Sequence, residues 1–269
     1  MRIAHRIFVA AGLTIALAWP AHATFEDGWQ AYQKGEFGRA FTEWQPLAER
    51  GDARAQFNLG VLFEQGKGVE QNFSIAISWW VKAAEQGHVG AQHNLASIYI
   101  AGDGIDRDYG AALHWLRVAA DQSHAPAAYT LGKMYSYGLG VKASPREATR
   151  WIQRAAELGD MRAQYNMGKA HRDGVGATKD MGRAVQWFRR AAEQGYANAQ
   201  IALAERYARG EGVKPSRVEA LFWATLAADQ NLTRAQTRRD QLARDLSARD
   251  RVTLERLLNE RPRPKSPTL

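Results

Sequence analysis

A tryptophan recurs every 36 residues through the middle of the chain (115−79, 151−115, 187−151 and 223−187 are all 36). The series consists of Trp79, Trp115, Trp151, Trp187 and Trp223. A fixed period of roughly 20–50 residues is typical of a solenoid, in which each unit buries its apolar face only against its neighbours. The interval therefore predicts a stack of near-identical modules. It does not suggest a single active site, which has no use for one aromatic residue per module.

The other repeated positions keep the same register. In the first part of a module an alanine, a leucine or methionine and an aromatic follow at intervals of four, as in Ala55, Leu59 and Phe63, although the fourth copy has His171 at the aromatic position. These spacings place the side chains on one helical face. Glycine pairs follow at Gly66/Gly68, Gly102/Gly104, Gly138/Gly140, Gly174/Gly176 and Gly210/Gly212. Each module is predicted to contain a first helix (helix A), a glycine loop, a second helix (helix B) and a tight turn.

Capping residues mark the predicted helix ends. One position before helix B holds Asn72, Asp108, Ser144, Asp180 and Ser216, all favoured N-cap residues. Glu147 and Glu219 follow the two serines by three residues and are predicted to complete capping boxes. The turn to the next module carries Gly87, Gly159 and Gly195, with Asn231 as a common substitute and Ser123 as the imperfect member.

The third copy shows the motif most fully, with Ala127, Leu131-Gly132, Tyr135, Gly138-x-Gly140-Val141, Ala148, Trp151, Ala155-Ala156 and Gly159. This motif resembles the Sel1-like repeat family, relatives of the tetratricopeptide repeats. The resemblance implies an all-α, right-handed α–α superhelical solenoid of two-helix repeats of about 36 residues. The expected organisation is a leader at 1–23, a degenerate repeat at 24–52, five repeats at 53–88, 89–124, 125–160, 161–196 and 197–232, capping helices at 233–259, and a disordered tail at 260–269.

The first residues predict a secretory signal peptide. A basic start at Arg2, an apolar run over 7–19 and an Ala-His-Ala tripeptide at 21–23 indicate cleavage between Ala23 and Thr24. The run is shorter than the roughly 20 apolar residues that a spanning helix needs, although an uncleaved anchor is the alternative. The chain has no cysteine, which excludes a lipidated cysteine, disulfides and thiol chemistry. We expect a periplasmic or secreted product that does not span the membrane after cleavage.

The positive charge is concentrated at the C-terminal end. The formal charge is +8, and removal of the leader with its two arginines leaves +6. From Thr233 onward ten Lys or Arg face five Asp or Glu, so this segment contributes +5 and the repeats are close to neutral. One interpretation is a solvated pair of capping helices, in which Val252, Leu254, Leu257 and Leu258 seal the end of the stack. The alternative is a patch for an anionic envelope partner.

Catalytic motifs are not found in the sequence. It contains no His-Glu-x-x-His helix, no Gly-x-Ser-x-Gly elbow, no phosphate loop and no Ser-x-x-Lys. His88 and His124 occupy equivalent turn positions, but no third ligand joins them in the motif, so a metal site is disfavoured. His171 is interpreted as a half-buried substitute for the aromatic, with pH sensing as the alternative. We expect no enzyme activity, no cofactor and no metal, and nucleic-acid binding is disfavoured because no basic–aromatic motif is present.

The remaining candidate site is a binding surface on helix A. Asn58, Asn94 and Asn166 share one register, and Thr130 and Ala202 complete the series. The resemblance to tetratricopeptide modules implies that helix A lines a concave groove and that such asparagines bind a peptide backbone. Lys133 and Lys169, three residues further along helix A, could add carboxylate contacts. The alternative is that the asparagines satisfy backbone groups between repeats.

These features predict a non-catalytic exported scaffold or adaptor that binds a protein or peptide. The family resemblance implies roles such as restraint of an envelope sensor kinase, control of exopolysaccharide synthesis, or host contact. The alternative is recognition of a peptidoglycan fragment or association with a cell-wall hydrolase. Fold alone does not identify the partner.

The tryptophan series is interpreted as core, because each tryptophan follows one alanine by three residues and precedes an alanine pair. An exposed ligand platform is the alternative. On the core interpretation, Trp151→Ala would cost about 3–5 kcal/mol.

Overall fold

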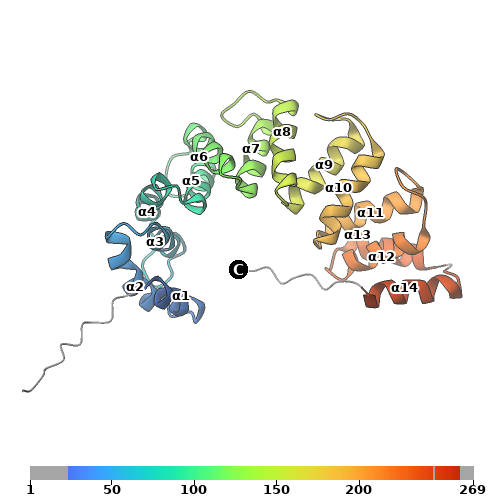
Figure 1. Ribbon diagram of the computed structural model, residues 1–269, viewed down its shortest axis with the longest axis horizontal. Helices are drawn as coiled ribbons and strands as arrows, with labels where there is room; N and C mark the ends of the chain where they lie inside the picture. The colour runs from blue at the N-terminus through green and yellow to red at the C-terminus, as the bar shows by residue number, and fades with distance from the viewer. Residues whose placement is uncertain (1–23, 245, 261–269) are drawn as a thin grey trace, which may run out of the picture.

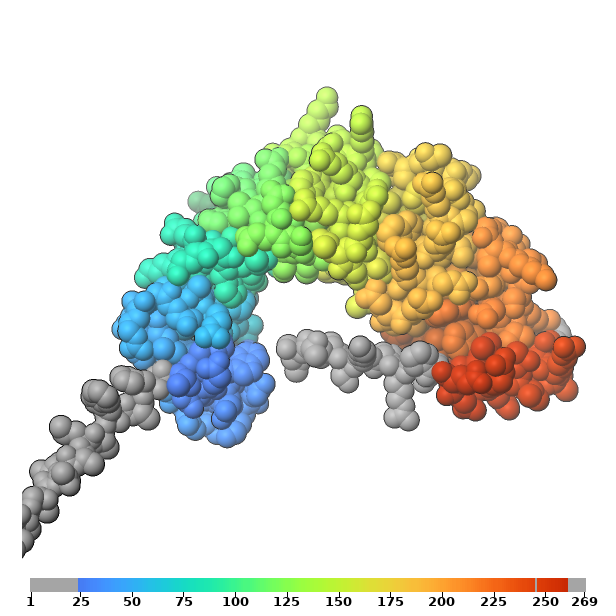
Figure 2. All heavy atoms as spheres, viewed as in Figure 1, coloured from blue at the N-terminus to red at the C-terminus, as the bar shows by residue number. Residues whose placement is uncertain are grey.

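The computed structural model describes residues 24–244 and 246–260, and within them every secondary-structure element is an α-helix. The helices follow one another along an arc, with α1 and α14 at its two ends (Figure 1). The space-filling view shows a crescent that curves over a hollow (Figure 2). The predicted leader at 1–23 and residues 261–269 of the predicted tail lie outside the described residues.

The five repeats each contain two helices. Helix A is α3 (Ala53–Gln65), α5 (Val89–Ala101), α7 (Ala125–Tyr137), α9 (Met161–Asp173) and α11 (Ala197–Arg209). Helix B is α4 (Phe73–Glu85), α6 (Tyr109–Asp121), α8 (Pro145–Glu157), α10 (Met181–Glu193) and α12 (Arg217–Ala228). The flanking helices are α1 (Phe25–Gln33), α2 (Phe37–Glu49), α13 (Thr233–Ala243) and α14 (Ala248–Glu260). None of the described helices is long and apolar enough to cross a membrane.

The predicted caps determine where the helices begin and end. All five predicted N-cap side chains of helix B accept a hydrogen bond from the backbone N–H three residues later. Ser123 and Asn231 adopt the left-handed conformation of the turn glycines, with φ of 64° and 61°. The predicted capping boxes are half formed, because the structure records no return bond from Glu147 or Glu219 to its serine. A complete box occurs at the start of α1, between Thr24 and Asp27.

In repeats one, three and four, a glycine of helix A faces a large side chain of helix B. A Cβ at Gly60 would overlap the Trp80 indole, and a Cβ at Gly168 would overlap the Phe188 ring. The close approach allows Trp80 Nε1 to donate to the carbonyl oxygen of Phe57 at 3.0 Å. The side chains at the Trp80 position therefore belong to the core of helix B, and Trp44 of α2 is their counterpart, with no exposed surface.

The tryptophan series lies beside this core position, and the prediction that all five belong to the core was wrong. Trp223 is 6% exposed, but the other four tryptophans are only partly buried. Trp79 packs on the cluster formed by α1–α3, and Trp187 on the cluster formed by α5–α9. Cations cover rings of the series, with Lys82 Nζ at 4.2 Å from the Trp79 centroid. Trp79 and Trp187 thus contact the preceding repeat, and the residue after each of the four partly buried tryptophans lies in the core.

Buried glutamines join successive repeats. Gln56, Gln92, Gln164 and Gln200 of helix A are at most 6% exposed. Each Nε2 donates to a carbonyl oxygen of the preceding helix B, at 3.0–3.2 Å. Each Oε1 accepts from a second glutamine, Gln86, Gln122, Gln194 or Gln230, at 2.7–2.9 Å. Repeat three replaces both members of the pair, with Ala128 and Leu158. These bonds fix the register of neighbouring repeats from inside the stack.

The C-terminal helices cover the last repeat less completely than predicted. Ala235, Leu242 and Leu246 are buried in the last core cluster, and Leu254 packs against it. Helix α14 has no fully buried residue, and Val252 is 67% exposed. The segment before α14 therefore provides most of the apolar cover. Ser247 caps the start of α14, since its Oγ accepts from Asp250 N–H at 3.1 Å.

The adjacent residues Trp79 and Trp80 test which tryptophan is core. Trp80→Ala should cost about 3–5 kcal/mol of unfolding free energy, because it removes a buried aromatic and leaves a cavity. Trp79→Ala should cost roughly half as much or less, since the ring is already partly solvated. Urea titration of both variants measures the difference. Equal losses would show that the two indoles are equally buried.

The glutamine pair is tested by single and double substitution. Gln92→Ala leaves the carbonyl of Ala84 and the Gln122 amide without their partner, and should cost about 1–3 kcal/mol. The double variant Gln92→Ala/Gln122→Leu copies repeat three, and should cost less than the sum of the two single changes. Strict additivity in thermal or urea unfolding would contradict coupling of the pair.

Candidate functional site

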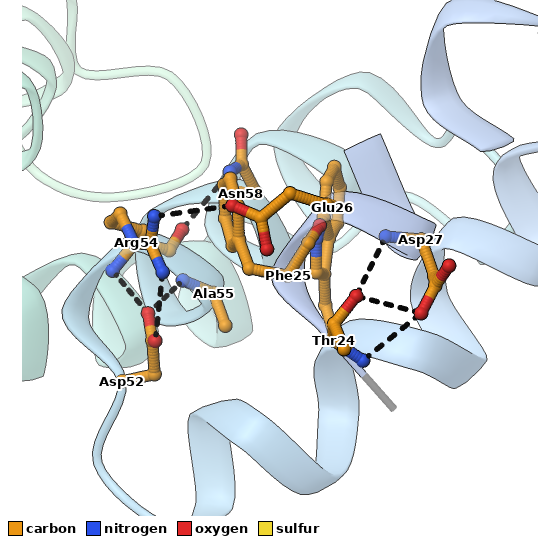
Figure 3. Close-up of polar contacts among 9 residues, drawn as sticks. Thr24, Phe25, Glu26, Asp27, Asp52, Arg54, Ala55 and Asn58 are labelled. Carbon is orange, nitrogen blue, oxygen red and sulfur yellow. Dashed lines mark hydrogen bonds and ion pairs between the residues drawn. The ribbon is translucent and has the colours of Figure 1, made fainter. Parts of the chain in front are cut away.

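The three predicted asparagines lie on helix A, each partly exposed. Asn58 Nδ2 donates to the Arg54 carbonyl oxygen at 3.0 Å, within the same helix (Figure 3). Asn166 Nδ2 donates to the Arg162 carbonyl oxygen at 2.9 Å and to Tyr129 Oη of the preceding repeat at 3.1 Å. Among the described residues, Asn94 makes no side-chain hydrogen bond. None of the three bonds a backbone group of another repeat, and Asn166 contacts the preceding repeat through a side chain.

Each predicted lysine lies near an aromatic ring, Lys133 at the exposed Tyr137 and Lys169 at 5.9 Å from the Tyr165 centroid. Lys133 Nζ donates to Tyr137 Oη at 2.9 Å and lies 4.5 Å from the ring centroid. The hydrogen bond and charge of Lys133, with a smaller contribution from Lys169, lower the pKa of the Tyr137 phenol. Tyr137 is 66% exposed at the end of α7. The arrangement offers two cations and an aromatic ring to an incoming group, a combination suited to a carboxylate beside an apolar side chain.

An aromatic row follows the N-terminal turns of helix A. At three junctions the residue before the asparagine position contacts the ring at the N-cap of the next repeat. Phe57 stacks on His88 at 4.5 Å between ring centroids, His93 lies tilted to His124 at 5.1 Å, and Tyr165 meets Tyr196 edge-on at 5.4 Å. At the remaining junction Arg162 lies 4.7 Å above the Tyr129 ring. These contacts tie adjacent repeats together along one edge of the helix-A surface.

His88 and His124 are helix N-caps. His88 Nδ1 accepts from Ala91 N–H at 3.2 Å, and His124 Nδ1 accepts from Ala127 N–H at 3.3 Å. An accepting Nδ1 has no proton, so capping favours the neutral imidazole that carries its proton on Nε2. Asp52 and Asp160 cap helix A in two other repeats in the same way. The chemistry at these positions is therefore structural, and within the described residues no three His, Cys, Asp or Glu side chains gather as a metal site.

Burial keeps three histidines neutral. Burial, together with the charges of His124 and Arg162, lowers the pKa of His93 from 6.5 to about 4. Burial also lowers the pKa of His88, against the opposing effects of its backbone hydrogen bond and Asp52. Burial alone lowers the pKa of His124. Because all three pKa values are lowered, the folded chain binds fewer protons than the unfolded chain as the pH falls from about 6.5 toward the His93 pKa of about 4.

The N-terminal end of the helix-A surface is closed by Arg54. Its guanidinium lies 4.2 Å above the Phe25 ring, 3.7 Å from Glu26 Oε1 and 3.6 Å from Asp52 Oδ2 (Figure 3). Each of these groups is at least partly exposed, so the ion pairs contribute little to stability. They do join α1 to the start of α3, which completes the surface at this end.

Ion pairs use part of the C-terminal positive charge. Arg238 lies 3.0 Å from Glu205 of α11, and Arg239 lies 2.9 Å from Asp240. Arg256 lies 3.2 Å from Glu260 within α14. This pairing fits the interpretation of the segment as capping helices. An anionic envelope partner at this end stays a prediction.

The sequence indicated the asparagine and lysine positions but missed Tyr137 and the aromatic row. The aromatic row could have been found from the residue before each asparagine position, which is Phe57, His93, Tyr129 or Tyr165 in four repeats. Tyr137 had no such periodicity, because its equivalents are Gln65, Ala101, Asp173 and Arg209. Only the helix geometry shows that it lies one turn beyond Lys133.

The histidines predict a loss of stability in mild acid. Because the folded pKa values are lowered, the stabilisation is complete above pH 6.5 and is lost as the pH falls toward 4. For His93 the loss by pH 4 is on the order of 3 kcal/mol. His93→Phe, which copies Phe57 of the preceding repeat, should flatten unfolding free energy against pH. His114→Gln on exposed helix B serves as the control and should leave the slope unchanged; an unchanged slope in His93→Phe would contradict the assignment.

The comparisons with known proteins agree with this geometry. The Sel1 repeat family matches residues 53–88, 89–124, 125–160, 162–196 and 197–232, more than half of the chain. A Sel1 repeat protein from Oxalobacter formigenes has a similar crystal structure, with a TM-score of 0.72 and 34% identity over 86% of this chain and 95% of that chain. Another similar structure is c5321, a protective antigen of uropathogenic Escherichia coli with an SLR fold. Its TM-score is 0.71 and its identity 29%, over 89% of this chain and 56% of that chain.

A search of the curated proteins gives no match. The five family matches and the two similar structures confirm the predicted all-α superhelical repeat fold. The chain belongs to the Sel1 repeat family.

Proposed function

We propose that this protein is a non-catalytic exported adaptor that binds a protein or peptide along helix A. Sel1 repeat proteins generally mediate protein–protein interactions, and the repeat scaffold is generally non-catalytic. The observation that carries the proposal is the polar row of helix A, formed by Asn58, Asn94, Asn166, Lys133 and Lys169. Its side chains make no bond to the backbone of another repeat, and a single hydrogen bond, from Asn166 to the Tyr129 hydroxyl, joins the row to a neighbouring repeat.

The chemistry of the row suits an extended segment with an acidic side chain. The Asn94 amide has no partner among the described residues, so it can both donate to and accept from a peptide backbone. Lys133, Lys169 and the exposed Tyr137 lie further along helix A and supply charge and an aromatic surface. A carboxylate of the partner would pair with the lysines while its backbone lies along the asparagines.

Support for export comes from the start of α1. Thr24, the first residue after the predicted cleavage position, is the N-cap of α1, and its backbone N lies 3.3 Å from Asp27 Oδ2. Cleavage between Ala23 and Thr24 would turn this N–H into an α-ammonium group beside a carboxylate. The capping box would remain and gain a charge pair, so the mature chain could begin there without loss of helix α1.

A regulatory or host-contact role in the envelope follows from an adaptor of this kind. Restraint of a sensor kinase or of exopolysaccharide synthesis requires binding without chemistry, which the helix-A row supplies. Host contact is supported by the similarity to c5321, which is a protective antigen in uropathogenic Escherichia coli. Either role depends on one protein partner that recognises the helix-A row.

Affinity capture from envelope extract tests the proposal. Residues 24–269 are immobilised as wild type, as Asn94→Ala/Asn166→Ala and as Lys133→Ala/Lys169→Ala. Both double variants should lose a specific protein partner while the unfolding free energy changes by no more than about 0.5 kcal/mol per site. Lys142→Ala, in the loop after α7, removes a similar charge away from the row and should retain the partner.

Two outcomes would contradict the adaptor. Retention on purified peptidoglycan without any protein partner would favour the alternative, a peptidoglycan-binding or hydrolase-associated protein. A lowered melting temperature of Asn94→Ala/Asn166→Ala with unchanged capture of the partner would show that the asparagines are structural.

A further inference from the structure

A polar cavity of about 430 Å³ lies where repeats three and four meet. It is lined by α8, by α9, by the loop before α10 and by α10 itself. Small-molecule sites commonly occupy roughly 300–1,000 Å³. Met167 and His171 face this cavity, whereas Lys169, two residues from each of them, lies toward the opposite side of α9. The cavity is therefore separate from the helix-A row.

Repeat-specific substitutions open the cavity on the side of helix A. At the two neighbouring junctions an arginine of helix B bonds the tyrosine of the next helix A, Arg117 to Tyr135 at 3.0 Å and Arg189 to Tyr207. At this junction the equivalent residues are Gln153 and His171, both shorter, and both line the cavity. The arginine–tyrosine pair that would close the helix-A side of the cavity is therefore absent from the junction of repeats three and four.

Two more departures line the same space. Thr149 replaces an aliphatic residue, since its equivalents are Ile77, Leu113, Val185 and Leu221. Ala177 replaces a branched residue of the loop, since its equivalents are Val69, Ile105, Val141 and Val213. Four positions from three segments thus change together, each toward a smaller or more polar side chain. Four changes around one space indicate a formed site, because a chance packing defect would involve a single position.

The charges at the cavity favour an anion. Arg183 and Arg190 line it, and no Asp or Glu does. Arg183 pairs with Asp180 at 3.5 Å, whereas Arg190 has no ion pair among the described residues and lies 4.6 Å from the Trp187 centroid. His171 Nδ1 lies 3.0 Å from the Thr178 carbonyl oxygen and must donate to it, so Nε2 stays available to a ligand.

The geometry points to a binding site for a small organic anion. Arg190 and Arg183 would hold a carboxylate or a phosphate group, since guanidinium groups recognise both. Gln153, Thr149 and His171 Nε2 would bind the ligand's hydroxyl groups. The indole of Trp187 provides an apolar surface for the carbon skeleton. A hydroxylated acid, such as a sugar carboxylate or a sugar phosphate, has this combination of groups.

Titration calorimetry with the purified chain tests the site. The probes are glucuronate for a carboxylate, glucose 6-phosphate and inorganic phosphate for a phosphate, and glucose as the neutral control. At least one hydroxylated anion should bind at millimolar concentration or below while glucose does not. Comparison of glucuronate with glucose 6-phosphate identifies the charged group. If inorganic phosphate binds as tightly as glucose 6-phosphate, Gln153, Thr149 and His171 do not contact the sugar hydroxyl groups, and the proposal is contradicted.

Variants separate the site from general charge effects. Arg190→Gln should weaken binding by about tenfold or more, whereas Arg154→Gln, the equivalent arginine of the preceding repeat, should not. The double variant Gln153→Arg/His171→Tyr restores the pair found at neighbouring junctions, so it should fill the cavity and abolish binding. It leaves the helix-A row intact, so capture of a protein partner should continue. Undiminished binding in the double variant, or no binding of any anion to the wild type, would overturn the proposal.

Discussion

The buried glutamines of helix A hold successive repeats in register. Each one joins the end of the preceding helix B to its own helix A, and its Oε1 accepts from an exposed glutamine at the end of the following helix B. A buried amide left without partners is costly, so the bonds tolerate little sliding of one repeat past another. Repeat three replaces both members, with Ala128 and Leu158, which leaves no orphaned amide. With register set from inside, the outer faces are free to vary.

The sequence was sufficient for the architecture because the local chemistry repeats with the period. The turn residues act through their own backbone conformation, and each N-cap of helix B acts through a side chain that accepts from a backbone N–H three residues later, so their roles could be predicted one residue at a time. Burial of the tryptophans could not be predicted in this way. Adjacent helical positions differ by about 100°, so the alanine spacing fits both Trp79 and Trp80, and only the approach of Gly60 determines which one is core.

The functional surfaces were less predictable, because they combine residues from different repeats. The asparagine row was visible in register, but the partners of each amide depend on neighbouring helices, as Asn166 and Tyr129 show. The cavity at His171 was harder to predict, because it forms only where an arginine, a tyrosine and two aliphatic residues are all replaced at the same junction. A histidine alone suggested only a substituted aromatic. The helix-A row and the cavity lie on different sides of α9, so one scaffold can present two surfaces.

The central claim is that helix A carries the working surface of the scaffold. Site-specific photo-crosslinking in cells tests it most directly, with the probe placed at Tyr137 on helix A or at Arg150 on helix B, where the side chain is 76% exposed. We predict a discrete crosslinked protein from position 137 and none from position 150. Crosslinking only from position 150, or equally from both, would contradict the account.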